Sequence, residues 1–231
     1  MASFALPFPF FLLADEHHQR LETIQLEVVK DATMQTGYNL ASFQYLLVGN
    51  HRDWPKKRFV IQFEDLPRHC TNVERAVMYL KYACAHKASW MTDNEAPYIT
   101  RELNTHRILR PWDEQAVYST YMEAGIDYIP EPMEKVALPY EGNEGQLANG
   151  YVPFSVIQAV KKWASGATNC GILVMDLKEA VLGRDRRFWS SKGPHENRPY
   201  LEVTFHSNGG CKCICKSFYI GSISEVTYTW M

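Results

Sequence analysis

The chain has no run of eighteen apolar residues among its 231 positions, so the sequence contains no segment typical of a membrane-spanning helix. It also has no excess of positive charge, since 24 Lys and Arg face 26 Asp and Glu and leave a formal net charge of -2. Phosphate binding needs a clustered positive face. We therefore expect no membrane span and no nucleic acid as the main partner.

Catalytic signatures are missing as well. The sequence has no Gly-x-Ser-x-Gly elbow, no His-Glu-x-x-His pair and no phosphate-binding loop. Two adjacent carboxylate pairs, Glu64-Asp65 and Asp113-Glu114, have no partner at a defined separation, as acid–base catalysis on a glycoside requires. An enzyme is therefore not expected. The absence of any Asn-x-Ser/Thr sequon is mildly against a heavily processed cell-surface protein.

The residues that are present favour β-structure. Hydrophobic residues make up 46% of the chain, aromatic residues 13%, and 13 Tyr and 6 Trp are more typical of strands than of a helical bundle. Turn signals recur about every 8 to 15 residues, as in antiparallel sandwiches and barrels. The predicted strands are 23–28, 43–48, 58–63, 73–82, 98–109, 135–138, 172–175, 187–190, 200–205 and 212–219. The predicted fold is all-β, an antiparallel β-sandwich (jelly roll) with one short helix.

That helix lies in the stretch from Tyr151 to Leu177. Val156, Val160 and Trp163 recur with helical spacing and form one apolar stripe, and Gly166 is placed to end the helix. Ser155 followed by Gln158 three residues later predicts a capping box at its start. We expect this unit, a strand, a docked helix and a buried strand, to be core.

The N-terminal 20 residues predict either an arm or a vestigial signal segment, and residues 21–231 a single domain. The apolar stretch from Ser3 to Ala14 has the length of a signal-peptide core, but no Lys or Arg precedes it and Pro7 and Pro9 interrupt it. If it directs export, the protein is extracellular.

Six cysteines permit three disulfides in fifteen pairings. In a strand, alternate residues project from one face, so neighbouring cysteines in the CKCIC segment make poor partners for each other. We favour disulfides over a zinc site, to other cysteines of this chain or to another chain. The candidates are Cys70, Cys84, Cys170, Cys211, Cys213 and Cys215.

Several segments, in order, resemble the extracellular jelly-roll family known as DNRLRE domains, which are related to carbohydrate-binding modules. The segments that carry the resemblance are Asp31-Ala32, Asn39, Leu46 to Gly49, Arg58 to Phe63, Arg107, Pro111 to Val117, Val156 to Trp163, Asn169 to Gly171, Phe188 to Ser191 and Arg198 to Val203. Gln62 and Tyr118-Ser119 depart from the family's usual residues, and the CKCIC tail lies outside the shared pattern.

The resemblance implies a secreted, non-catalytic module that binds a polysaccharide or another glycan, in some cases with a structural calcium. Exposed aromatic rings that stack on sugars and basic groups that bind hydroxyls or uronates are the residue types such a site needs. The predicted ligand-binding residues are Trp54, Arg58, Arg107, Trp112 and Trp189. Asp31 is the candidate calcium ligand because hard cations prefer carboxylates, although it could equally cap a turn.

The region 151–205 is also similar to the prodomain arm of the transforming-growth-factor family. This similarity supports an alternative function, a structural or interaction protein that is disulfide-linked through its C-terminal cysteines and binds other extracellular proteins. The Arg184-Asp185-Arg186-Arg187 segment fits a basic processing-protease consensus, but we interpret it as a plain basic loop ahead of a strand.

Overall fold

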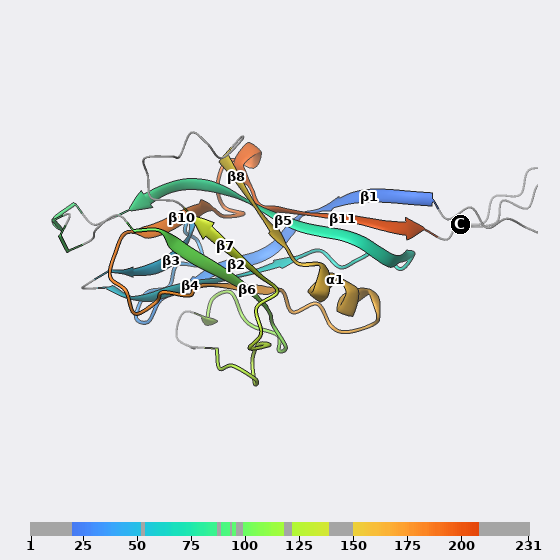
Figure 1. The fold of residues 1–231 in the computed structure, drawn as a ribbon, viewed down its shortest axis with the longest axis horizontal. Helices are drawn as coiled ribbons and strands as arrows, with labels where there is room; N and C mark the ends of the chain where they lie inside the picture. Colours follow the sequence, from blue (N-terminus) through green and yellow to red (C-terminus); the bar gives the residue numbers. More distant parts are fainter. Residues whose placement is uncertain are drawn as a thin grey trace, which may run out of the picture.

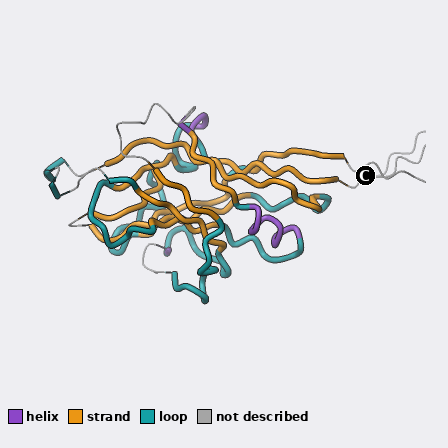
Figure 2. The backbone as a smooth tube through the Cα atoms, viewed as in Figure 1, coloured by secondary structure: helices purple, strands orange, loops and turns teal. Residues whose placement is uncertain are grey.

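The computed structural model describes residues 20–51, 54–86, 89–92, 94–95, 99–117, 122–138 and 150–207. These residues form a curled antiparallel sheet with one short α-helix, which confirms the predicted all-β, sandwich-like fold (Figures 1 and 2). The strands are β1 (Arg20–Leu26), β2 (Val28–Met34), β3 (Tyr45–His51), β4 (Trp54–Phe63), β5 (Cys70–His86), β6 (Arg101–Arg107), β7 (Glu134–Leu138), β8 (Tyr151–Ser155), β9 (Ile172–Asp176), β10 (Asp185–Trp189) and β11 (Tyr200–Ser207). The helices are α1 (Ile157–Ala164) and the 3₁₀ helix η4 (His195–Asn197).

The strands follow the order β1-β11-β5-β10-β3-β4-β9-β6-β7, while β2 pairs with β4 and β8 pairs with β5. The long β5 strand connects two regions, since its first part pairs with β11 and β8 and its last part pairs with β10. The β3–β4 pair then carries the sheet into the second layer, which holds β2, β9, β6 and β7. Arg20 pairs with Ser207, so β1 begins where β11 ends.

The main core lies between the layers and is built by strand alternation. In β11, Leu201, Val203 and Phe205 are buried while the residues between them are half-buried. They pack with apolar side chains of the facing strands, among them Phe59 and Phe188, whose ring centroids are 5.9 Å apart. A second apolar cluster covers the other face of β4 around Val60. Burial on both faces explains why β4 reads as a nearly continuous apolar run.

The helix α1 docks where the sequence predicts it. Val156 and Val160 are 0% exposed and Trp163 is 7% exposed, so the predicted stripe is core. Gly166 has φ +97°, the left-handed conformation expected after a helix end. The predicted capping box is wrong: Val156 is the N-cap residue and makes no side-chain capping bond. Ser155 instead ends β8, where it pairs with Val77.

The interpretation of residues 184–187 as a basic loop is also wrong. Arg184 is 8% exposed, and Asp185 and Arg186, at the start of β10, are 0% exposed. A processing protease needs its recognition residues accessible in an extended, mobile segment. The folded domain therefore does not present this consensus for cleavage.

Strand boundaries differ from the predictions mainly at the ends. The first predicted strand is two strands, β1 and β2, and the β5 strand extends the predicted 73–82 segment at both ends. The segment 98–109 is a strand only over Arg101–Arg107. The predicted strand 212–219 lies outside the described residues, and so does the predicted N-terminal arm or signal segment, residues 1–20, apart from Arg20, which begins β1. No helix in the described part of the chain is long and apolar enough to cross a membrane.

Candidate functional site

Of the five predicted ligand-binding residues, the four whose side chains the structure describes are not gathered into one exposed surface. Trp112 is a core residue rather than an exposed platform: it is 9% exposed and belongs to the second apolar cluster. Its Nε1 atom donates to the carbonyl oxygen of Cys170 at 2.8 Å, and the Lys30 ammonium lies 4.2 Å from its ring centroid. These contacts leave the indole no open face for a sugar.

Arg58 has a structural partner. Its Nε and Nη2 atoms donate to the two carboxylate oxygens of Glu179 at 2.5 and 2.8 Å, and the side chains are only 12% and 10% exposed. A bidentate pair of this kind holds both groups in one geometry. Arg107 is half-buried at the end of β6, opposite Ile172. In the register of β4, β9 and β6, Arg58 shares the face of the second apolar cluster with Val60, whereas Arg107 shares the opposite face with Ile172.

Trp189 is half-buried on β10 and packs against Tyr45, with ring centroids 4.5 Å apart. A Cβ atom on Gly193 would lie 2.8 Å from Cε3 of the Trp189 ring, so the backbone passes directly over the indole. This close approach requires glycine. For Trp54 only the backbone, at the start of β4, is described, and its side chain lies outside the described residues.

Asp31 is 1% exposed, and its carboxylate already has a cationic partner. The ammonium of Lys192 lies 2.6 Å from Oδ1 and 3.0 Å from the backbone carbonyl oxygen of Asp31, and it also contacts Glu114. Burial disfavours the charged Lys192, but the two carboxylates outweigh burial and raise the pKa of Lys192. The described residues contain no group of three or more His, Cys, Asp or Glu suited to a metal. Calcium binding at Asp31 stays a prediction without support from this geometry.

The cysteine predictions fall into two groups. Cys70 and Cys170 are free, buried thiols at 2% exposure, and Cys84 is half-buried on β5. Burial raises the pKa of Cys70 to about 11 and also raises that of Cys170. Cys211, Cys213 and Cys215 lie outside the described residues, so disulfides that involve them stay a prediction.

A different surface carries a cluster of partly exposed aromatic rings. On the outward face of β8, β5 and β11 lie Tyr79, Tyr151 and Tyr200, flanked by Arg75, Lys81 and Glu202; we call these six residues the tyrosine face. Tyr200 pairs with Tyr79 across the strands, and their rings stack with centroids 4.9 Å apart and an interplanar angle of 22°. Tyr151 meets Tyr200 edge-on at 5.5 Å.

Hydrogen bonds and charges hold these rings in position. Arg75 bridges Glu202 and the hydroxyl oxygen of Tyr79, to which its Nη2 atom donates at 2.7 Å. The Tyr151 hydroxyl donates to the carbonyl oxygen of Glu196 at 3.0 Å. Burial raises the pKa values of Tyr151 and Tyr200, so both stay protonated at neutral pH. Within the described residues the Tyr200 hydroxyl makes no hydrogen bond and is available to a ligand.

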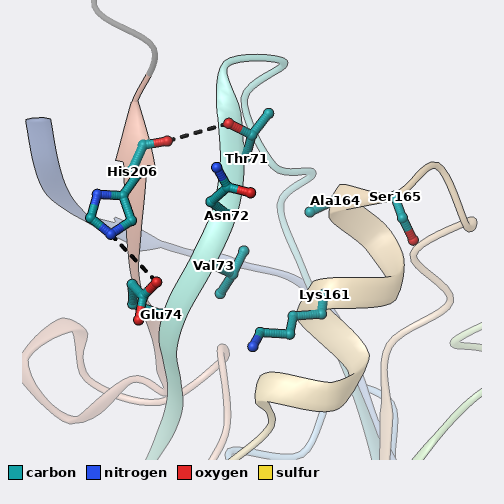
Figure 3. A pocket seen from close by; sticks show the side chains of 8 residues that line it. All are labelled: Thr71, Asn72, Val73, Glu74, Lys161, Ala164, Ser165 and His206. Carbon is teal, nitrogen blue, oxygen red and sulfur yellow. Dashed lines mark hydrogen bonds and ion pairs between the residues drawn. The ribbon is translucent and has the colours of Figure 1, made fainter. Parts of the chain in front are cut away.

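An open hollow of about 590 Å³ lies beyond the far end of this face, between α1 and the first residues of β5. Figure 3 shows its lining, in which Lys161 reaches from α1 and the His206 ring lies beside Glu74, with Nε2 and Oε1 3.4 Å apart. Asn72 has φ +49°, an uncommon backbone conformation for a residue other than glycine. His206 belongs to the same outward row of β11 as Tyr200 and Glu202. The tyrosine face and the hollow thus share β5 and β11.

The sequence contained a signal for the tyrosine face. The alternation Tyr200-Leu201-Glu202-Val203-Thr204 predicts that the tyrosine and the glutamate share the face opposite the core. Nothing local predicts Tyr79 as the neighbour of Tyr200, because the two residues meet only through the β5–β11 register.

No protein-family model matches the chain, and no curated protein matches it. The resemblance to DNRLRE domains and to the growth-factor prodomain arm therefore stays a prediction.

Proposed function

We propose that the protein is a non-catalytic extracellular β-sandwich module that binds a polysaccharide or another glycan on the tyrosine face. The observation that carries the proposal is the stacked, partly exposed pair Tyr79 and Tyr200 on an open sheet face. Sugar rings bind to aromatic faces and edges through their apolar C–H groups, while polar side chains around them bind the hydroxyls.

The charges around the rings indicate the ligand class. Arg75, with a side chain 47% exposed, carries a guanidinium next to the ring pair, and the Lys81 ammonium lies 5.0 Å from the centroid of the Tyr151 ring. Guanidinium and ammonium groups bind carboxylates and sulfates through charge-assisted hydrogen bonds. Glu202 neutralises part of this charge and accepts hydrogen bonds from hydroxyls. We therefore favour an acidic polysaccharide over a neutral one.

The experiment is binding of the purified chain to a panel of acidic and neutral polysaccharides, followed by isothermal titration with the best ligand. Tyr200→Ala is expected to weaken binding about fivefold, since one aromatic contact contributes on the order of 1 kcal/mol. Tyr38→Ala is the matched control because Tyr38 is an exposed tyrosine, at 51%, in the turn after β2.

Both variants are expected to keep the thermal midpoint of the wild type within a few degrees, so a loss of binding is separable from unfolding. A wild-type chain that binds no polysaccharide in the panel contradicts the proposal. Loss of binding in both variants contradicts the location of the site but not the function.

The alternative is a structural or interaction protein. Tyrosine and arginine are also the residues enriched in protein interfaces, so the same face suits an extracellular protein partner. A chain that binds no glycan but is recovered as a disulfide-linked oligomer on non-reducing gels favours this alternative.

A further inference from the structure

Lys57 and Asp185 form an ion pair that is sealed from water. The Nζ atom of Lys57 lies 2.5 Å from Oδ2 of Asp185, and both side chains are 0% exposed. Lys57 lies on β4 and Asp185 on β10, 128 positions apart in the sequence. The pair therefore joins two strands that are not neighbours in the sheet, since β3 lies between them.

Gly49 on β3 lies next to both partners. It lies directly opposite Lys57 in the β3–β4 pair, and a Cβ atom at Gly49 would stand 3.2 Å from the Cα atom of Asp185. The same Cβ atom would lie 3.5 Å from Cζ and Nε of Arg101, so a side chain at this position would press on the Asp185 backbone and on the Arg101 guanidinium. The glycine also has φ +125°, a conformation that other residues rarely adopt.

The surroundings disfavour the charged form of Lys57. Burial lowers the pKa of Lys57, the Asp185 carboxylate offsets this only in part, and the charges of Arg187 and Arg101 lower it further. Transfer of one proton from the ammonium to the carboxylate turns a buried ion pair into an amine next to a carboxylic acid, which low polarity favours over two charges. An unprotonated amine is a nucleophile, and an acid carbonyl is its electrophile.

We propose that Lys57 and Asp185 are a modification site at which the two side chains condense to an intramolecular isopeptide bond. The Lys57 nitrogen attacks Cγ of Asp185, a C–N bond forms and a C–O bond breaks. The departing oxygen leaves as water, with the proton that the carboxylic acid received from the ammonium and one more proton from the attacking amine. The net balance is –NH₃⁺ plus –COO⁻ giving –NH–CO– plus H₂O: two of the three ammonium protons leave in the water molecule and the third stays on the amide nitrogen. The step needs no oxidant and no further reactant.

Three neighbours act on this step. The strands hold the amine and the carboxyl carbon in contact, which replaces a bimolecular encounter by an effectively unimolecular one. The Nδ1 atom of His86 lies 3.5 Å from Oδ1 of Asp185 and is placed to pass protons to the departing oxygen. The positive charge of Arg101, which four hydrogen bonds to Asp176, Val181, Arg184 and Asn50 hold in place, stabilises the tetrahedral oxyanion.

A second lysine–aspartate pair in the same chain provides the contrast. Lys192 and Asp31 are 2.6 Å apart, but the Lys192 side chain is 28% exposed and a second carboxylate, Glu114, keeps it charged. This pair remains ionic. The difference between the pairs is burial and charge, not distance.

The test is the mass of the full-length chain after reduction, followed by mapping of its proteolytic peptides. We expect the intact mass to be lower by one water molecule, and a branched peptide in which the segment that holds Lys57 is joined to the segment that holds Asp185. Peptides with Lys192 and Asp31 are expected to be separate in the same digest.

Two variants give the control. Lys57→Arg keeps the charge but removes the nucleophile, so its mass is expected to be that of the unmodified sequence. Asp185→Asn is expected to lose one ammonia instead of one water, because the amide then supplies the leaving group. The proposal is overturned if the wild-type chain, after prolonged incubation in the folded state, has the full mass of the unmodified sequence and yields Lys57 and Asp185 in separate peptides. A loss of water that maps to other residues overturns it as well.

Discussion

The indole Nε1 of Trp112 donates a 2.8 Å hydrogen bond to the backbone carbonyl oxygen of Cys170, just ahead of β9. This bond connects the loop after β6 to the sheet. The ammonium of Lys30, on β2, lies over the Trp112 ring. Trp112 is thus a structural residue of the second apolar cluster.

Trp112→Ala is expected to lower the free energy of unfolding by about 3–5 kcal/mol, because it removes a large buried ring and leaves a cavity. Trp112→Phe retains most of the packing but leaves the Cys170 carbonyl without its partner, so a loss of about 1–3 kcal/mol is expected. Chemical denaturation measures both values. A Trp112→Ala chain of wild-type stability that has lost glycan binding would contradict the structural role.

Gly171 and Gly166 allow the cost of a steric clash to be separated from the cost of backbone strain. Both have positive φ, at +89° and +97°, but a Cβ atom at Gly171 would lie 2.4 Å from the carbonyl oxygen of Ile61, whereas nothing lies within 4 Å at Gly166. Gly166→Ala is expected to cost about 1–2 kcal/mol, the strain of the left-handed conformation alone. Gly171→Ala is expected to cost clearly more, because β4 must move. Equal losses in thermal or chemical unfolding would contradict this reason.

His106 predicts a pH dependence of stability. Its side chain is buried at 3% exposure on β6, Nδ1 lies 2.9 Å from the carbonyl oxygen of Ile129, and the ring packs edge-on against Tyr128. Burial lowers the pKa of His106 from 6.5, so the unfolded chain binds a proton at a higher pH than the folded one. Below about pH 6.5 the unfolded state therefore holds more protons, and stability falls as the pH is lowered through this range.

The measurement is the free energy of unfolding of the wild type and of His106→Phe at pH values between about 7.5 and 5, in steps of about half a pH unit. This range spans the ordinary histidine pKa of about 6.5. The variant is expected to lose less stability on acidification than the wild type. Tyr128→Phe is the control, since it changes the same packing site without removing the titrating group. Identical slopes for the wild type and His106→Phe would show that the folded protein tolerates the protonated ring.

Cys70 and Cys170 are expected to resist alkylation in the folded protein. Both thiols are 2% exposed, and burial raises the pKa of Cys70 to about 11, so the reactive thiolate is rare at neutral pH. Iodoacetamide is expected to label them only after unfolding, as peptide mapping would show. If both cysteines resist labelling in denaturant until a reductant is added, they are disulfide-bonded and the free thiols are contradicted.

Local pattern was sufficient for much of the fold. The alternation in β11 and the apolar run of β9 predicted strands that the structure confirms, and the spacing of Val156, Val160 and Trp163 predicted the helix and its buried face. Periodicities of two and of about 3.6 residues report which face of an element is apolar, and this information is local. The geometry of the helix cap is less local. The capping-box pattern assigned Ser155 to the start of the helix, but Ser155 pairs with β5 as the last residue of β8.

The candidate site was not predictable in the same way. Trp112 was predicted to be an exposed aromatic residue, but its hydrogen-bond partner Cys170 lies 58 positions further along the chain. Asp185 and Arg186 resembled a solvated basic loop, yet the fold buries them among charges supplied by other strands. In each case a long-range partner decides whether the side chain faces water.

The amino-acid sequence by itself determined that this chain forms antiparallel strands with one amphipathic helix, because the spacing of apolar residues within each segment indicates a strand or a helix. Only the tertiary structure decided that Tyr79 meets Tyr200 and that Lys57 on β4 meets Asp185 on β10 across β3. Those meetings follow from strand register and from contacts between distant segments, which depend on the packing of the whole sheet rather than on any one stretch of it.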